Sequence, residues 1–78
     1  MESQDEILKA FGQALRAVRM KQGLSQLHIA NVSDIDRAYV SELERGLKNP
    51  SLVVLFRLAE ALEASPIELI KETVKHLR

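Results

Sequence analysis

The side chains best suited to chemistry lie in a short helical pattern between Asp36 and Gly46. Val40 and Leu43, three residues apart, mark the apolar face of a helix over about 37–45. The opposite face carries guanidinium, methyl and carboxylate groups. Such groups can read base edges in a DNA major groove, because arginine donates to guanine, a methyl group contacts thymine and glutamate accepts from the cytosine amino group. The outward-facing residues are Arg37, Ala38, Ser41, Glu42 and Arg45.

A second helical pattern, over about 26–32, precedes this helix and is expected to position it. Ser25 is a good N-cap for the first helix and Asp36 for the second. Leu27 is expected to face inward. A helix pair joined by so short a turn is typical of the helix-turn-helix, which presents its second helix to a major groove. Asp34 is expected to take the positive φ that such a turn needs, since aspartate is one of few non-glycine residues that adopt it.

Three further helices are predicted around this pair. The first, over about 5–22, has an apolar stripe and ends before Gly23, a residue suited to the left-handed conformation that closes helices. The second follows Ser51, and the third follows Ser65 and begins with Pro66, where Ser65 and Glu68 are expected to form a capping box. Just before Ser51 the chain carries a cation and an amide suited to phosphate contact. These are Lys48 and Asn49, and the first stripe is Ile7, Phe11, Leu15 and Val18.

The last two helices are more apolar than a single core-facing stripe requires. The helix over about 52–63 is expected to bury Leu52 and Phe56, while Val54 and Leu58 lie on a different side. This surplus favours a homodimer interface, and a well-filled monomer core is the alternative. The residues expected at the interface are Val54, Leu58, Leu69, Ile70, Val74 and Leu77.

Composition narrows the class of protein. With 78 residues, we expect one domain over 1–78, and the absence of cysteine excludes disulfides and thiolate zinc sites. His28 and His76 are isolated, so neither a metal site nor a cofactor is expected. Catalysis is not expected either, because the chain has no cysteine, only these two isolated histidines and no glycine-rich phosphate loop. There is no apolar run long enough for a membrane span and no basic–apolar leader, which predicts a cytoplasmic protein.

Charge adds a weaker indication. The formal net charge is zero, but it is unevenly distributed along the chain. Residues 1–6 hold three acids and no base, residues 7–50 hold seven bases and four acids, and residues 51–78 hold four of each. The positive excess therefore coincides with the half that carries the proposed base-reading helix.

Five short motifs follow one another along the chain: LRAVR (15–19), GLSQ (23–26), AYVSELERG (38–46), NPSL (49–52) and LAEAL (58–62). Together they resemble the XRE/Cro-like helix-turn-helix family of phage and bacterial regulators over roughly residues 10–70. DRAYVSELERG, with the NPS that follows, is most similar to the restriction–modification controller subgroup. The resemblance implies an all-α, compact five-helix, lambda-repressor-like DNA-binding domain with its helix-turn-helix at about 25–46.

The resemblance also implies roles for single residues. Arg37, Ala38 and Glu42 match base-contacting positions, and Arg19 and Glu44 match an ion pair that joins the first helix to the third. Two positions depart from the family pattern: Asp34 replaces the usual turn glycine, and Ala38 stands where a polar residue is common. The positions near the DNA backbone are Gln26, Tyr39, Ser41, Arg45, Lys48 and Asn49.

The expected function is that of a transcriptional regulator which binds an inverted-repeat operator as a homodimer. Its partners would be double-stranded DNA and a second copy, with RNA polymerase or a partner protein as further candidates. The alternative is a protein-interaction module, an antitoxin or adaptor, that uses the same fold to bind a partner through its last two helices.

Overall fold

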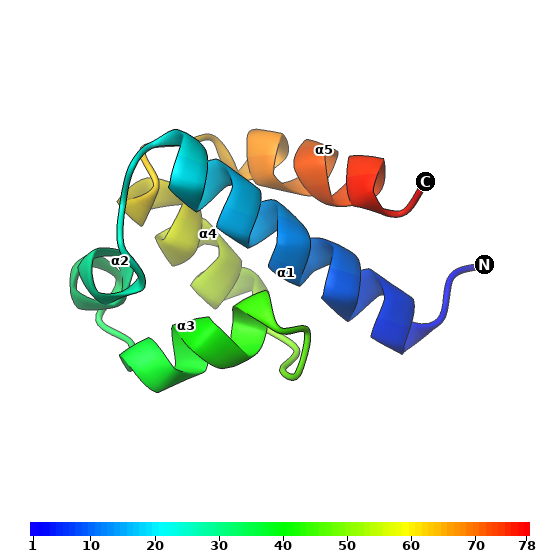
Figure 1. The fold of residues 1–78 in the computed structure, drawn as a ribbon, viewed down its shortest axis with the longest axis horizontal. Coiled ribbons are helices and arrows are strands. Elements are labelled where there is room, and N and C mark those ends of the chain that lie inside the picture. The colour runs from blue at the N-terminus through cyan, green and yellow to red at the C-terminus, as the bar shows by residue number, and fades with distance from the viewer.

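The computed structural model describes residues 1–78 and contains five helices and no strand (Figure 1). The predicted all-α, five-helix fold is confirmed. None of the helices combines the length and apolar character that crossing a membrane requires. The helices are α1 (Gln4–Lys21), α2 (Gln26–Ser33), α3 (Arg37–Glu44), α4 (Leu52–Ala61) and α5 (Pro66–His76).

Serine side chains define the start of four of the five helices. The Oγ atoms of Ser3, Ser25, Ser51 and Ser65 each accept a hydrogen bond from a backbone N–H in the first turn. The full capping box belongs to α1, where the Ser3 N–H also donates to Glu6 Oε1 at 3.0 Å. The Ser65 N–H donates no such return bond to Glu68, so the box expected there is wrong although its cap is right.

The start of α3 differs from these four. Asp36 occupies the N-cap position with the extended backbone that a cap requires, but its side chain makes no capping hydrogen bond. The helix therefore relies on tertiary contacts for its position. At its other end Gly46 adopts a φ of +76°, a conformation that ends the helix.

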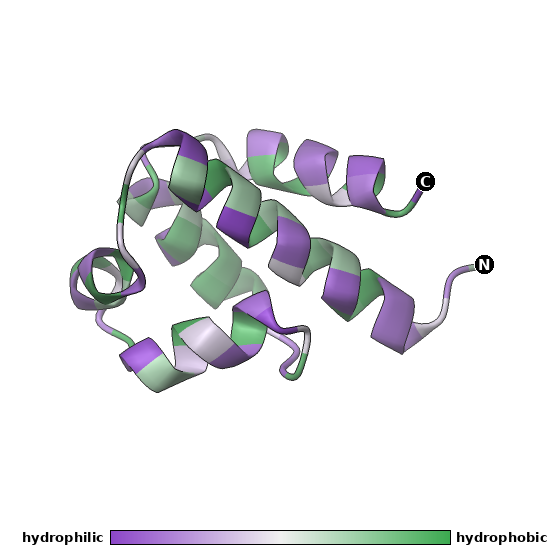
Figure 2. Ribbon diagram, in the orientation of Figure 1, coloured by the Kyte–Doolittle hydropathy of each residue, from purple (hydrophilic) through white to green (hydrophobic).

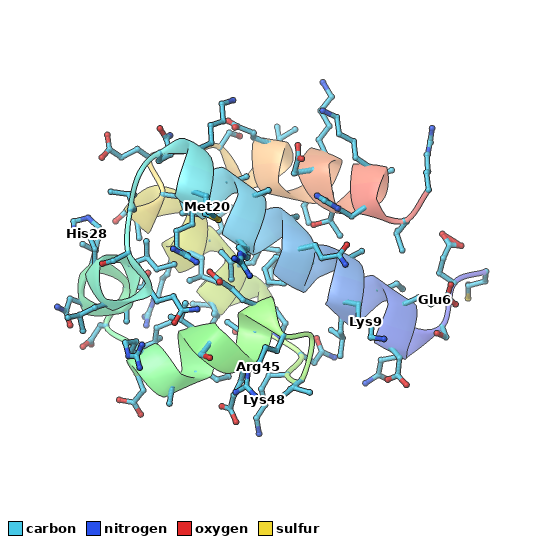
Figure 3. All side chains as sticks on the ribbon, in the orientation of Figure 1. Glu6, Lys9, Met20, His28, Arg45 and Lys48 are labelled. Atoms are coloured by element: carbon cyan, nitrogen blue, oxygen red, sulfur yellow. The ribbon has the colours of Figure 1, made fainter.

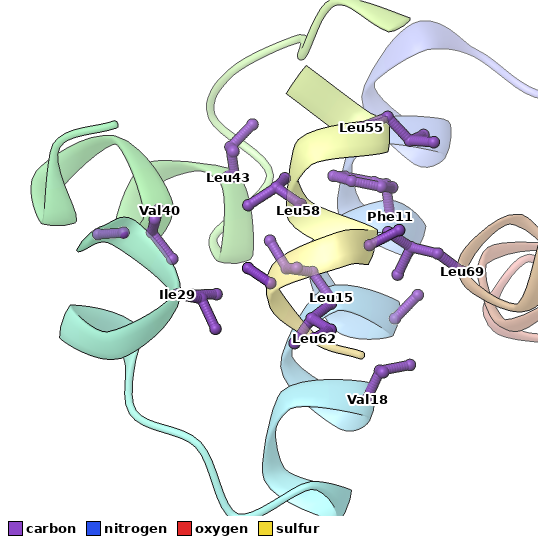
Figure 4. Packing of buried hydrophobic residues seen from close by; sticks show 14 residues of the cluster. Phe11, Leu15, Val18, Ile29, Val40, Leu43, Leu55, Leu58, Leu62 and Leu69 are labelled. Carbon is purple, nitrogen blue, oxygen red and sulfur yellow. The ribbon is translucent and has the colours of Figure 1, made fainter. Parts of the chain in front are cut away.

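The core is one cluster of fourteen buried residues to which all five helices contribute (Figure 4). α1 supplies Phe11, Ala14, Leu15 and Val18, and it packs along α5 on one side and against α3 on the other (Figure 1). Ile29 of α2 and Leu43 of α3 are fully buried, and so both short helices are fixed to this common core. The apolar side chains of both helices thus orient their polar faces outward.

The structure corrects two residues of the expected dimer interface. Leu58 and Leu69 are 0% exposed and lie in the monomer core, so neither can contact a second copy (Figure 4). Leu52 and Phe56, expected inside, are instead exposed, as are Ile7 and Leu27. The reason is visible on α4, which is apolar over most of its length and therefore gives periodicity no contrast from which to choose a face (Figure 2).

Candidate nucleic-acid interface

The turn between α2 and α3 has the geometry of a tight helix pair. Asp34 adopts a left-handed backbone with φ +58° and ψ +45°, as predicted. Its N–H donates to the Asn31 carbonyl at 3.3 Å, and the N–H of Ile35 donates to the Ala30 carbonyl at 3.0 Å. These bonds satisfy the last carbonyls of α2 while the half-buried Ile35 packs against the core. The turn thereby fixes the angle at which α3 leaves α2.

A hydrogen-bonded ion pair holds the end of α3 against α1. Arg19 Nε lies 2.6 Å from Glu44 Oε2, and Arg19 Nη2 lies 3.0 Å from Glu44 Oε1. The two side chains are only 14% and 5% exposed. The structure thus contains the expected pair, in the bidentate geometry that gives arginine–carboxylate contacts their directionality. These hydrogen bonds raise the pKa of Arg19 above its ordinary value, against the smaller opposing effect of burial.

Glu44 also binds a third element, which the sequence did not indicate. Gln26 Nε2, in the first turn of α2, donates to Glu44 Oε1 at 3.0 Å, while Arg19 Nη1 donates to the Leu24 carbonyl at 3.0 Å. One buried carboxylate thus connects α1, the start of α2 and the end of α3. The amide of Gln26 retains further hydrogen-bonding capacity, and its contact with phosphate stays a prediction.

Gly12 allows α1 and α3 to approach each other at backbone distance. A Cβ atom at this position would lie 2.5 Å from the carbonyl oxygens of both Leu43 and Glu44. No side chain larger than hydrogen fits there unless α3 moves. Sequence analysis missed this residue, because a glycine inside a helical pattern signals close approach without naming the neighbour.

The outer face of α3 carries the predicted base-reading groups at the surface. Arg37 and Ala38 are exposed and Glu42 is half-buried. Arg45 is exposed as well, and its Nε donates to the Ser41 carbonyl at 3.4 Å. Arg45 and Lys48 project from the same side of the molecule (Figure 3). The side chains of Arg37, Glu42 and Arg45 thus form no ion pair and no hydrogen bond to another helix.

A hollow of about 610 Å³ runs along this face between α2 and α3. Its surface combines carboxylates, one lysine, one phenol and small apolar groups. The predicted residues Ala38, Tyr39, Glu42 and Lys48 meet there, whereas Arg37, Gln26, Ser41, Arg45 and Asn49 lie outside it. The remaining lining residues are Ala30, Asn31, Asp34, Ile35 and Asp36.

A second surface of different character lies on α4 and α5. An open groove of about 260 Å³ there is lined by Leu52, Leu55, Phe56, Pro66, Ile67 and Ile70. Leu52 is 71% exposed, Phe56 54% and Ile67 77%. Of the residues predicted for dimer contact, Ile70 and Val74 are exposed, while Val54 and Leu77 are half-buried. Apolar side chains this exposed and this close together are typical of an interaction surface.

Neither surface has the constellation of a metal site. No group of three or more histidine, cysteine, aspartate or glutamate side chains is arranged to hold a metal ion. The only histidine–carboxylate contact is His76 Nε2 to Glu72 Oε1, at 3.6 Å on the exposed side of α5. The chemistry that the first surface offers is thus hydrogen bonding and charge.

Comparison with known proteins places the chain among DNA-binding regulators. Residues 15–69 match the family model described as helix-turn-helix. The control protein C.BamHI of Bacillus amyloliquefaciens is 38% identical over 64 residues, which covers 81% of this chain and 79% of that protein.

Two solved structures are similar in fold as well as in sequence. The restriction–modification controller C.AhdI from Aeromonas hydrophila is 50% identical with a TM-score of 0.77, and the match covers 80% of this chain and 94% of that one. The controller C.Esp1396I, solved as a tetramer with its natural 35-base-pair operator, is 25% identical with a TM-score of 0.83 over 91% of this chain and 93% of that one.

Proposed function

The chain belongs to the XRE-like helix-turn-helix family of DNA-binding transcription regulators, and from this premise we propose that it binds one specific operator as a homodimer. The identity to C.AhdI and C.BamHI further supports a role as a restriction–modification controller. The family is non-enzymatic, so binding alone would be the activity.

The observation that carries the proposal is the separation of tasks on α3. Val40 and Leu43 are buried and Glu44 is tied to two other helices, so the inner side of α3 fixes its position. The outer side presents Arg37, Ala38 and Glu42 on a helix exposed enough to enter a major groove. Because these side chains form no hydrogen bond or ion pair within the protein, base reading is the use that their chemistry supports best.

Phosphate contacts would set the register of α3 on the duplex. Lys48 and Asn49 are exposed in the loop just before α4, next to the backbone N–H groups of its first turn. Arg45 extends the same basic edge (Figure 3). With Gln26, Tyr39 and Ser41, these residues would contact the DNA backbone and position the base-reading helix.

The apolar groove on α4 and α5 supports the homodimer. Two copies related by a two-fold axis would cover Leu52, Phe56 and Ile67 against the same surface of the partner. Such symmetry implies an inverted-repeat operator whose half-sites are about one helical turn apart, roughly 34–36 Å. We therefore assign the dimer contact to Leu52, Phe56 and Ile67 in place of the buried Leu58 and Leu69.

The first test is selection of bound sequences from a random duplex library at about 150 mM salt, where non-specific binding is suppressed. We expect an enriched inverted repeat, bound by two copies in sedimentation analysis. Failure to enrich any sequence would contradict the proposal.

Two substitutions then separate base reading from phosphate contact. Arg37→Ala should cost about 1–3 kcal/mol of binding free energy and relax preference at one base pair. Lys48→Ala should weaken binding to all sequences alike and reduce the salt slope by about one unit. Unchanged affinity and base preference in Arg37→Ala would contradict the assignment of α3.

The alternative is an interaction module, an antitoxin or adaptor, that binds a partner protein through α4 and α5. The same exposed groove favours it, because an apolar surface does not by itself specify its occupant. A monomeric chain in solution that forms a stoichiometric complex with one purified partner would support this alternative; a stable homodimer of the free chain would count against it.

A further inference from the structure

We propose that Glu42 requires an operator base that carries an exocyclic amino group, and that methylation of this amino nitrogen blocks binding. The inference rests on the proposed function and adds to it a chemical condition on the DNA. It assigns to the regulator a direct sensitivity to the modification state of its own site.

Glu42 is placed for recognition and not for stability. It follows Ala38 by four residues, so the two side chains share the outer face of α3, and both line the hollow beside Lys48. Glu42 is half-buried as a residue, and its carboxylate takes part in no hydrogen bond within the protein and in no ion pair. Glu44, two residues later, accepts hydrogen bonds from both Arg19 and Gln26. Unlike Glu44, Glu42 therefore keeps both carboxylate oxygens free to accept hydrogen bonds from DNA.

The chemistry of the carboxylate restricts what it can face. An ionised carboxylate only accepts hydrogen bonds. In the major groove only cytosine N4 and adenine N6 donate, whereas guanine presents N7 and O6 and thymine presents O4, all of them acceptors. A guanine or thymine opposite Glu42 would place lone pairs against a negative charge. The base at this position must therefore be cytosine or adenine.

Methylation of the amino nitrogen removes the one hydrogen that Glu42 can use. Of the two amino hydrogens, one is engaged in the Watson–Crick pair and the other points into the major groove. A methyl group on the nitrogen replaces the groove-facing hydrogen when the base remains paired. Glu42 would then face an apolar group, which leaves its carboxylate without a donor in the protein–DNA interface. Methylation at cytosine C5 leaves both amino hydrogens in place and serves as the chemical control.

The experiment uses the operator obtained by selection. Comparison of wild type with Glu42→Ala on single-base variants of this operator identifies the base pair whose preference depends on Glu42. Operators are then synthesised with N4-methylcytosine or N6-methyladenine at this base, and with the same modification at an amino-bearing base outside the half-site. Binding is measured at one fixed salt concentration. Melting of Glu42→Ala should match wild type, because the side chain makes no hydrogen bond and no ion pair in the free protein.

We expect modification at the Glu42-dependent base to weaken wild-type binding roughly tenfold or more, the size of a lost base contact. Modification outside the half-site, or at cytosine C5, should leave affinity within about twofold. Glu42→Ala should bind the modified and unmodified operators equally. A wild type that binds both equally, a base preference that does not depend on Glu42, or a Glu42→Ala variant that still discriminates would overturn the inference alone. Absence of any enriched operator would overturn the proposed function, and the inference with it.

Discussion

The helix-turn-helix side of the molecule and the α4–α5 side differ in the kind of side chain that they expose and in what satisfies it. On the first, buried polar groups hydrogen-bond to one another, and the cations Arg37, Arg45 and Lys48 are exposed. On the second, Leu52, Phe56 and Ile67 are exposed although nothing polar surrounds them in the groove. On the first surface, the polar groups that position α3 are therefore satisfied within one copy of the chain. The second buries its apolar area only when another molecule covers it.

The largest expected effect tests the hydrogen-bonded ion pair on the helix-turn-helix side. Glu44→Ala should lower the free energy of unfolding by about 3–5 kcal/mol, because it leaves the guanidinium of Arg19 partly buried without its partner. Chemical denaturation measures this loss. The matched control is Glu42→Ala on the same helix, which should stay within about 0.5 kcal/mol of wild type. Equal losses in the two variants would mean that the ion pair does not stabilise the fold.

The next largest effect tests the apolar groove on α4 and α5. Phe56→Lys should weaken self-association by about 2 kcal/mol, roughly thirtyfold, because it places a charge among the apolar side chains that line the α4–α5 groove. Sedimentation equilibrium provides the dissociation constant. Leu47→Lys is the control, since Leu47 is similarly exposed but lies outside the groove, in the loop between α3 and α4. A wild-type dissociation constant retained by Phe56→Lys would move the interface elsewhere.

A smaller effect tests how closely α3 must dock. Glycine to alanine inside a helix normally stabilises by about 0.5–1 kcal/mol. At Gly12 the added Cβ meets two carbonyl oxygens at 2.5 Å, and we expect a net loss of about 1–2 kcal/mol in thermal or chemical unfolding. DNA affinity should fall by more than stability explains, because α3 must shift. A stabilised Gly12→Ala variant would show that the backbone contact is dispensable.

The smallest effect concerns pH and lies outside both surfaces. The hydrogen bond from the Ser3 N–H, and then the one from the Ser3 side chain, lower the pKa of Glu6 from its ordinary value of 4.5. The stabilising contribution of this cap is thus fully present above about pH 4.5 and is lost as the pH falls through the lower folded-state pKa. An NMR titration of the Glu6 carboxyl group should report this lowered pKa, whereas Glu6→Gln should remove the pH dependence and keep an acceptor.

The sequence predicted the helices and the α2–α3 turn well because local rules govern them. The caps Ser25, Ser51 and Ser65, together with Gly23 and Asp34, act within a few residues of their positions and were placed correctly, whereas the Ser3 cap was missed. The prediction of the buried face of α4 was wrong because nearly every residue on that helix is apolar. Only tertiary packing decides that Leu58 is buried and Phe56 exposed. The Gln26–Glu44 bond and the Gly12 contact join residues far apart in sequence, and periodicity carries no information about them.

The convergence on Glu44 has a consequence for how such a regulator can diverge in evolution. Since the position of α3 depends on its inward residues, substitutions at Arg37, Ala38 and Glu42 can accumulate with little loss of stability. A duplicated copy could acquire a new operator through a few such changes while its fold stays intact. The residues that hold the fold and the residues that can vary with the operator thus lie on opposite faces of a single eight-residue helix.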